Sequence, residues 1–213
     1  MRRGILALVI ASIFFSSNAA IIDRIAIIVG DNIIKDSDID RDLRITEFLN
    51  EQPLTLTDAA RKEAADRLIN QMLIRHEIRT GEYPFASLEQ AEQELHALIT
   101  RRYKTHVTFE QALHRYGITE QELEIYFQWQ LTVLDFINAR FKPAVYITGQ
   151  QIRKYYSEHA AALEREYPGQ SFDQLRDRIR DILTGEQVNE EFFAWLNQQR
   201  SSSKIQYLEG NLQ

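Results

Sequence analysis

Alternating acidic residues form the pattern in this sequence that most resembles a metal site. Four aspartates and a glutamate fall on positions 1, 3, 5, 7 and 12 of a calcium-binding EF-hand loop: Asp36, Asp38, Asp40, Asp42 and Glu47. That loop needs glycine at its sixth position for a sharp turn, and this sequence has Arg41 there. A strand-like rather than a helical pattern precedes the segment. We therefore interpret it as a helix N-terminus whose acids complement the helix dipole.

Other catalytic or ligand-binding motifs are missing from the sequence. The histidines form neither a His-Glu-x-x-His motif nor an i, i+4 pair: His76, His96, His106, His114 and His159. There is no Gly-x-Ser-x-Gly elbow and no glycine-rich phosphate loop, and the eight glycines are dispersed singly. Carboxylates are plentiful, but no spacing singles out a pair. We predict no catalytic residues, no metal site and no cofactor.

The segment from Thr119 to Phe141 indicates a different kind of site, because its pattern is more apolar than a surface helix requires. Polar residues cover only about a third of its circumference. A central buried helix would explain this pattern. Alternatively, one apolar stripe lines an open groove that accepts apolar segments of another polypeptide. We take one stripe as the candidate client-binding surface: Ile125, Trp129, Val133 and Phe136.

The first residues have the features of an export signal. A basic start, Met1-Arg2-Arg3, precedes an apolar run from Gly4 to Phe15 and a small-residue end. The run is shorter than the roughly 20 residues that span a bilayer. We therefore predict that residues 1–19 are a signal peptide cleaved near Ala19, and that the mature chain does not insert stably into the membrane. An uncleaved anchor is the alternative.

Composition limits the partners and the fold. Loss of two of the 25 basic residues with the signal leaves 23 against 31 acidic ones, a net charge of −8. An acidic chain without basic runs argues against binding to nucleic acid. The absence of cysteine excludes disulfides and thiol chemistry. Only eight glycines and four prolines are present, which favours a helical protein.

Helix-start signals divide the chain into elements. Ile22 to Ile34 reads as a β-hairpin, after which Ser37 is expected to cap a helix, and Thr57 the next one. Five Ser/Thr-x-x-Glu/Gln boxes then predict helices that begin at Ser87, Thr108, Thr119, Thr148 (to about Tyr167) and Ser171 (to about Arg200). The tail from Lys204 to Leu208 is strand-like. A lone strand must pair its backbone groups, so we expect it to pair with the hairpin.

These segments, in this order, resemble the SurA-type periplasmic chaperones. Asp23 to Ile34 with Ser37-Asp38-Ile39 is similar to the strand, turn and helix start that open that family. Arg67 to Ile74 with Glu77 resembles its second helical signature. Later similarities are spread over the rest of the chain: Phe109, Leu113, Gly117-Ile118-Thr119, Leu123, Ile147-Thr148, Ile152, Tyr155-Tyr156, Phe172, Arg176, Ile179, Leu183, Trp195-Leu196, Arg200 and Ile205 to Leu208.

One departure from the family pattern bears on activity. About a hundred residues of parvulin-type isomerase domain usually follow the Tyr-Tyr helix in these chaperones. Here only Glu166 to Ser171 connects that helix to the last one. We therefore do not carry over the isomerase activity, and we predict that the chain is not an enzyme.

The resemblance implies a mainly α, multi-helix SurA-like core with a small antiparallel sheet. We expect this core to span residues 20–213, with a helical part over 20–167 and a returning helix and strand over 171–213. The implied function is an ATP-independent periplasmic holdase for unfolded polypeptides, in particular outer-membrane proteins. The alternatives are a prolyl isomerase and an adaptor for one fixed partner of the same family.

Overall fold

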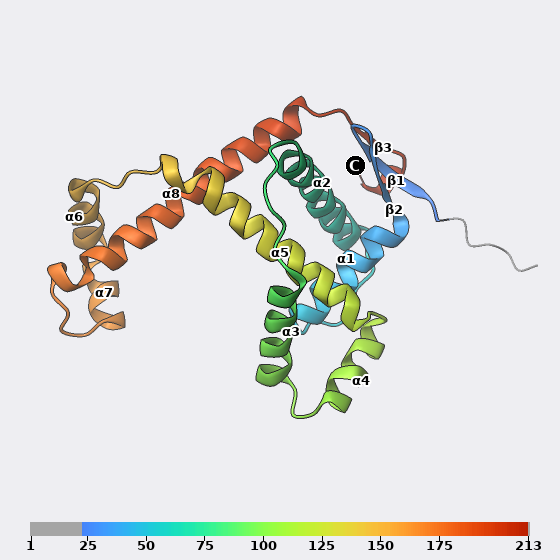
Figure 1. Ribbon diagram of the computed structural model, residues 1–213, viewed down its shortest axis with the longest axis horizontal. Helices are drawn as coiled ribbons and strands as arrows, with labels where there is room; N and C mark the ends of the chain where they lie inside the picture. Colours follow the sequence, from blue (N-terminus) through green and yellow to red (C-terminus); the bar gives the residue numbers. More distant parts are fainter. Residues whose placement is uncertain (1–22, 213) are drawn as a thin grey trace, which may run out of the picture.

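The computed structural model describes residues 23–212, and this part of the chain is mainly helical, as predicted. The predicted signal peptide, residues 1–19, lies outside it. Eight α-helices accompany a three-stranded antiparallel sheet in the described part (Figure 1). The elements are β1 (Ile25–Val29), β2 (Asn32–Lys35), α1 (Asp36–Leu49), α2 (Asp58–Thr80), α3 (Leu88–Arg102), α4 (His106–Tyr116), α5 (Glu120–Arg140), α6 (Gly149–Glu158), α7 (Ala160–Glu166), α8 (Phe172–Ser202) and β3 (Ile205–Tyr207), with 3-10 turns η1 (Lys142–Ala144) and η2 (Gly210–Leu212).

The sheet joins the two ends of the described chain, which confirms the predicted pairing. Its order is β2-β1-β3, and Ile27 lies opposite Tyr207 across the β1–β3 pair. Gly30, with φ of 58°, makes the tight turn between β1 and β2, a conformation that glycine adopts without steric cost. The short terminal strand thus pairs with β1 along one side and forms an edge of the sheet.

The residues after β3 return to the body of the protein and bury an apolar anchor. The Leu208 N–H donates to the Ala26 carbonyl at 2.8 Å, and the Asn211 side chain donates to Asp58 at 2.9 Å. Leu212 is only 1% exposed and lies in the largest hydrophobic cluster. The C-terminal segment therefore contributes packing as well as a strand.

Most helix starts are where the capping boxes predict them. The hydroxyls of Thr119 and Thr148 accept the N–H groups of Glu122 and Gln151, and these side chains accept the N–H groups of their caps. Ser87 and Ser171 also lie at the starts of helices with capping boxes. Thr57 caps α2 as expected.

Three boundaries differ from the prediction. The helix start expected at Thr108 lies earlier, because Thr105 caps α4 and Thr108 serves as its third residue. Lys35 rather than Ser37 precedes α1, and the Ser37 hydroxyl donates instead to Asp23 at 2.6 Å. The helix after Thr148 ends at Glu158, and α7 follows as a separate short helix.

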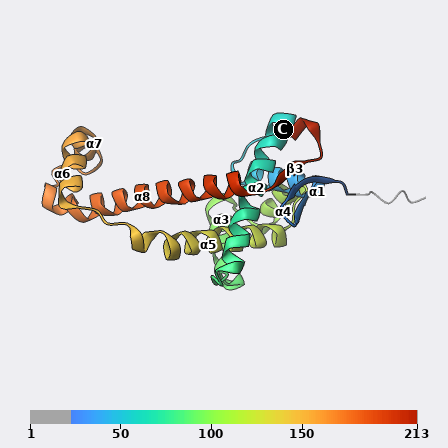
Figure 2. The same ribbon diagram turned by 90° about the horizontal axis from the view of Figure 1, so that it is seen from above.

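Three hydrophobic clusters stabilise the fold at different places. The first joins the sheet, α1, α2, the C-terminal half of α5 and the C-terminal half of α8. The second lies among α1, α3, α4 and the start of α5. The third packs α6 and α7 against the first half of α8, through Ile179 among others. Figures 1 and 2 show α6 and α7 at the far end of α8 from the sheet, so the molecule is elongated.

The C-terminal anchor generates a test of this closure. Leu212→Ala should lower the free energy of unfolding by about 2–4 kcal/mol, because it leaves a cavity in the largest cluster. Urea denaturation followed by circular dichroism measures the change.

Leu208→Ala is the matched control, since Leu208 is 49% exposed and its backbone still pairs with Ala26. We expect this substitution to change the unfolding free energy by no more than about 0.5 kcal/mol. Equal effects of the two substitutions would contradict the anchoring role of Leu212.

Candidate functional site

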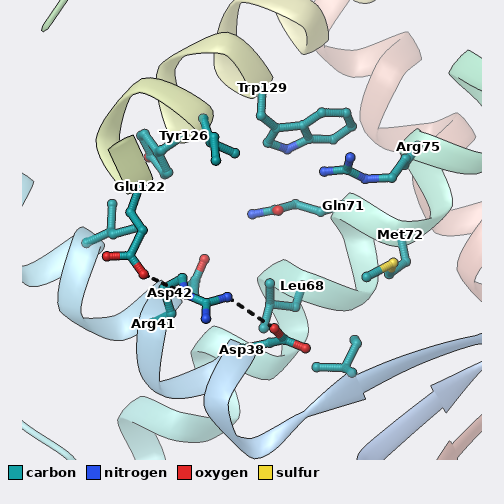
Figure 3. A pocket seen from close by; sticks show the side chains of 13 residues that line it. Asp38, Arg41, Asp42, Leu68, Gln71, Met72, Arg75, Glu122, Tyr126 and Trp129 are labelled. Atoms are coloured by element: carbon teal, nitrogen blue, oxygen red, sulfur yellow. Dashed lines mark hydrogen bonds and ion pairs between the residues drawn. The ribbon is translucent and has the colours of Figure 1, made fainter. Parts of the chain in front are cut away.

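An open cavity of about 420 Å³ lies between α1, α2 and α5 (Figure 3). Its volume is within the range of ligand-binding pockets, about 300–1,000 Å³. The lining mixes apolar and charged side chains: Ile34, Asp38, Arg41, Asp42, Ile45, Leu68, Gln71, Met72, Arg75, Glu122, Ile125, Tyr126 and Trp129. An apolar cavity with a few converging polar groups is the usual form of a binding site.

The structure separates the four candidate residues on α5. Ile125 and Trp129 line the cavity, with exposed fractions of 54% and 6%. Val133 is half-buried against the first hydrophobic cluster. Phe136 is 2% exposed, and its ring packs edge-to-face on Tyr83, with centroids 5.0 Å apart. Ile125 therefore lies at the mouth of the cavity, Trp129 is a core residue that also lines the cavity, and Phe136 belongs to the core alone.

The separation has a simple geometric reason. Positions 125 and 136 share a face of α5, because eleven residues are close to three helical turns. They are about 16 Å apart along the axis, however, and meet different neighbours. Trp195 of α8 and Tyr83 cover α5 at Phe136, while α1 and α2 leave an opening beside Ile125.

A cation and an aromatic ring meet at one end of the cavity. The Arg75 guanidinium of α2 lies over the Trp129 ring, 4.3 Å from its centroid. Such cation–π contacts contribute about 0.5–2 kcal/mol, more when they are desolvated. Burial, together with the charge of Arg79 one turn further on, lowers the pKa of Arg75.

An ion-paired network occupies the other end. Arg41 contacts Glu122 of α5 at 2.9 Å and Asp38 of its own helix at 3.4 Å (Figure 3). Burial acts to raise the pKa of Glu122, but hydrogen bonds from Thr119 and Arg41 outweigh it and leave the pKa below its ordinary value. Both carboxylates at this end of the cavity are therefore paired with the same arginine, and the group keeps one net negative charge.

Asp42 is the most buried acid of the site. Its side chain is 7% exposed, and Oδ2 accepts from Nε and Nη2 of Arg67 at 2.9 and 2.6 Å. Burial raises the pKa of Asp42, and the charge of Arg67 offsets part of this rise. Burial, with a smaller contribution from Asp42, also raises the pKa of the neighbouring Tyr126 hydroxyl. The Asp42–Arg67 pair joins α1 to α2 under the cavity.

The alternating aspartates form the first two turns of α1 rather than a calcium loop. Asp36 and Asp40 both accept hydrogen bonds from Arg61 of α2, which adds a second link between these helices. Over residues 23–212, no group of three or more histidine or acidic side chains is placed to hold a metal ion.

Sequence reasoning missed the contribution of α2 to the site. Gln71, Met72 and Arg75 lie on the side of α2 that faces Ile125 and Trp129. The sequence shows only that Arg75 directly follows the apolar pair Leu73-Ile74, and this pattern does not relate Arg75 to α5.

Comparison with known proteins adds no relative. No protein-family model matches the chain, and no curated protein shows significant similarity to it. Among the helices of residues 23–212, none combines the length and the apolar character that a bilayer span needs.

The Asp42–Arg67 pair leads to a prediction for stability and pH. Arg67→Gln should lower the unfolding free energy at about pH 7 by about 1–3 kcal/mol, because it leaves a buried carboxylate without its cation. The same change raises the pKa of Asp42 further. Protonation of Asp42 removes the unpaired charge. The difference in unfolding free energy between the variant and the unmodified protein should therefore shrink as the pH falls through the pKa of Asp42 in the folded variant, toward about pH 4.

Urea denaturation at several pH values measures this deficit. Arg41→Gln is the control, since Arg41 is 48% exposed and its pairs with Asp38 and Glu122 lie at the surface. We expect it to cost less than about 1 kcal/mol. A deficit for Arg67→Gln that is independent of pH would show that Asp42 is not the group left unpaired.

Proposed function

We propose that this chain is an ATP-independent periplasmic chaperone of the SurA type, which holds unfolded outer-membrane-type polypeptides. The observation that carries the proposal is the open cavity of about 420 Å³ beside Ile125 and Trp129. Ile125 is 54% exposed there although it belongs to an otherwise largely apolar helix. Exposed apolar surface at the mouth of a cavity is a feature of polypeptide-binding sites.

The composition of the lining suits clients of varied sequence. Leu68 and Ile125 offer aliphatic contacts, Trp129 contributes the exposed part of its ring, and Met72 offers a flexible thioether. Methionine adapts to differently shaped partners, because its side chain is unbranched and polarisable. A cavity of this kind binds an apolar side chain by burial alone and needs no covalent step.

Modest affinity is consistent with the proposed role. Burial of one large apolar side chain contributes about 1.5–3 kcal/mol, and the entropic cost of ordering the client reduces this gain. Each contact is then weak and reversible, so a client can leave without an energy source. Several such contacts on one client would raise the overall affinity by increasing the effective concentration.

The closed architecture also supports the proposal. The SurA resemblance implies a helical core whose last helix and strand return to the N-terminal hairpin. In the described chain, β3 pairs with β1 and α8 packs on α2 and α5. These features are expected of that class without being unique to it.

The exposed apolar residue of the cavity provides the functional test. Ile125→Asp should weaken suppression of aggregation, because it places a carboxylate where a client side chain would be buried. We expect the variant to need about tenfold more protein for the same effect, which corresponds to about 1.4 kcal/mol. Light scattering of a denatured porin-like protein, diluted with and without the mature chain, measures the suppression.

Leu134→Asp provides a matched control. Leu134 lies on the same helix with the same 54% exposure, but it does not line the cavity. The Leu134→Asp substitution should leave the suppression of aggregation unchanged. Equal loss in both variants would mean that general surface hydrophobicity, rather than the cavity, holds the client. Failure of the unmodified chain to suppress aggregation at a several-fold excess would reject the proposed function.

A further inference from the structure

The two ends of the cavity differ in charge balance. At one end, Arg41 is shared by two carboxylates, Asp38 and Glu122, so this group keeps an excess of one negative charge. Asp42, nearby, is matched by Arg67. At the other end, Arg75 forms no ion pair with any carboxylate of residues 23–212; it contacts the Trp129 ring and lies near the like charge of Arg79. The cavity thus offers one cation that the described protein does not neutralise.

The position of Arg75 makes this cation suitable for a ligand. The Arg75 guanidinium carbon lies 4.3 Å from the centroid of the Trp129 ring, and the guanidinium points into the cavity (Figure 3). A guanidinium carries five N–H donors in one plane. Arg79 follows one turn later on the same helix, so two like charges lie side by side. An anion at this place would relieve their repulsion and would accept hydrogen bonds from the Arg75 fork.

The size of the cavity restricts the rest of the ligand. A volume of about 420 Å³ holds one large side chain with its backbone groups, but not a long helix or strand. Apolar contacts come from Leu68, Met72 and Ile125. Gln71 points into the same space, and its carboxamide can donate to an oxygen or accept from an N–H group (Figure 3).

From these observations we infer that the cavity binds the C-terminal residue of a client polypeptide, with an apolar side chain inside and the α-carboxylate on Arg75. The occupant needs an apolar group next to a planar anion, and a chain end with a large apolar last residue supplies both. Gln71 is placed to contact the last peptide group. This inference rests on the proposed function only in taking the ligand to be a polypeptide.

Binding of two forms of one peptide tests the inference. A short fluorescent peptide that ends in phenylalanine is prepared with a free carboxylate and as its C-terminal amide, and fluorescence anisotropy measures the affinity of each. With the unmodified protein, the free acid should bind about tenfold more tightly than the amide, the loss expected when a charged hydrogen bond is removed. Added salt should reduce this difference.

Substitution of the cation should remove the preference. Arg75→Gln should bring the free acid to the affinity of the amide, while the amide itself binds as before. Arg153→Gln, which changes an exposed arginine of α6, should leave both affinities unchanged. The comparison of the two peptides on the unmodified chain does not depend on how either variant folds.

The possible outcomes separate this inference from the proposed function. Equal affinity of acid and amide would overturn recognition of the chain end and leave polypeptide binding intact. Failure of both peptides to bind at any accessible concentration would overturn both proposals. Binding of dodecanoate, an apolar carboxylate without a peptide group, in the absence of peptide binding would overturn the assignment to a polypeptide.

Discussion

The antiparallel pairing of β3 with β1 is the interaction on which the rest of the structure depends. It returns the C-terminal segment to the β1–β2 hairpin, and Leu212 then enters the largest hydrophobic cluster. This return holds the second half of α8 against α2 and α5, where Phe192 and Leu196 join the same cluster. Without the strand, α8 would be attached to the body by its packing and by the contacts of Arg200 with Asp66 and Asn70 of α2.

The cavity is a consequence of how α5 is held within this frame. At its start, α5 is tied to α1 by the Arg41–Glu122 pair, and near its end it is tied to α2 by Arg140 and Glu77 at 2.6 Å. Between these pairs, Gln128 donates to the Ala86 carbonyl and Thr132 accepts from the Ala86 N–H, so the middle of α5 is also held in place. The cavity lies along the first half of α5, from Glu122 to Trp129. Arg61 and Arg67 bind α1 to α2, the two helices that line the cavity opposite α5.

Much of the fold follows from short-range signals in the sequence. Capping pairs such as Thr119 with Glu122 locate helix starts, because each side chain satisfies a backbone group of the other residue. The terminal sheet follows from the need to pair an isolated strand. The error at α4 arises because Thr105 and Thr108 both suit a cap, and only their packing context decides between them.

The candidate site was less accessible to such reasoning. Periodicity places Ile125, Trp129 and Phe136 on one face of α5, but it does not tell which neighbour covers each turn. Tyr83 and Trp195 cover Phe136 from segments distant in sequence. Arg75 belongs to the site because α2 and α5 lie side by side in the fold, and no local sequence pattern predicts its contact with Trp129.

The two tryptophans allow a direct measurement of whether the cavity receives a polypeptide. Trp129 lines the cavity, whereas the indole N–H of Trp195 is buried among Phe136, Phe141 and Phe192. Two-dimensional ¹⁵N–¹H NMR resolves the two indole N–H signals during titration with an unfolded apolar peptide. If the cavity receives the peptide, the Trp129 signal should shift progressively while the Trp195 signal stays in place. Binding of the peptide without any shift at Trp129 would contradict a binding role for the cavity.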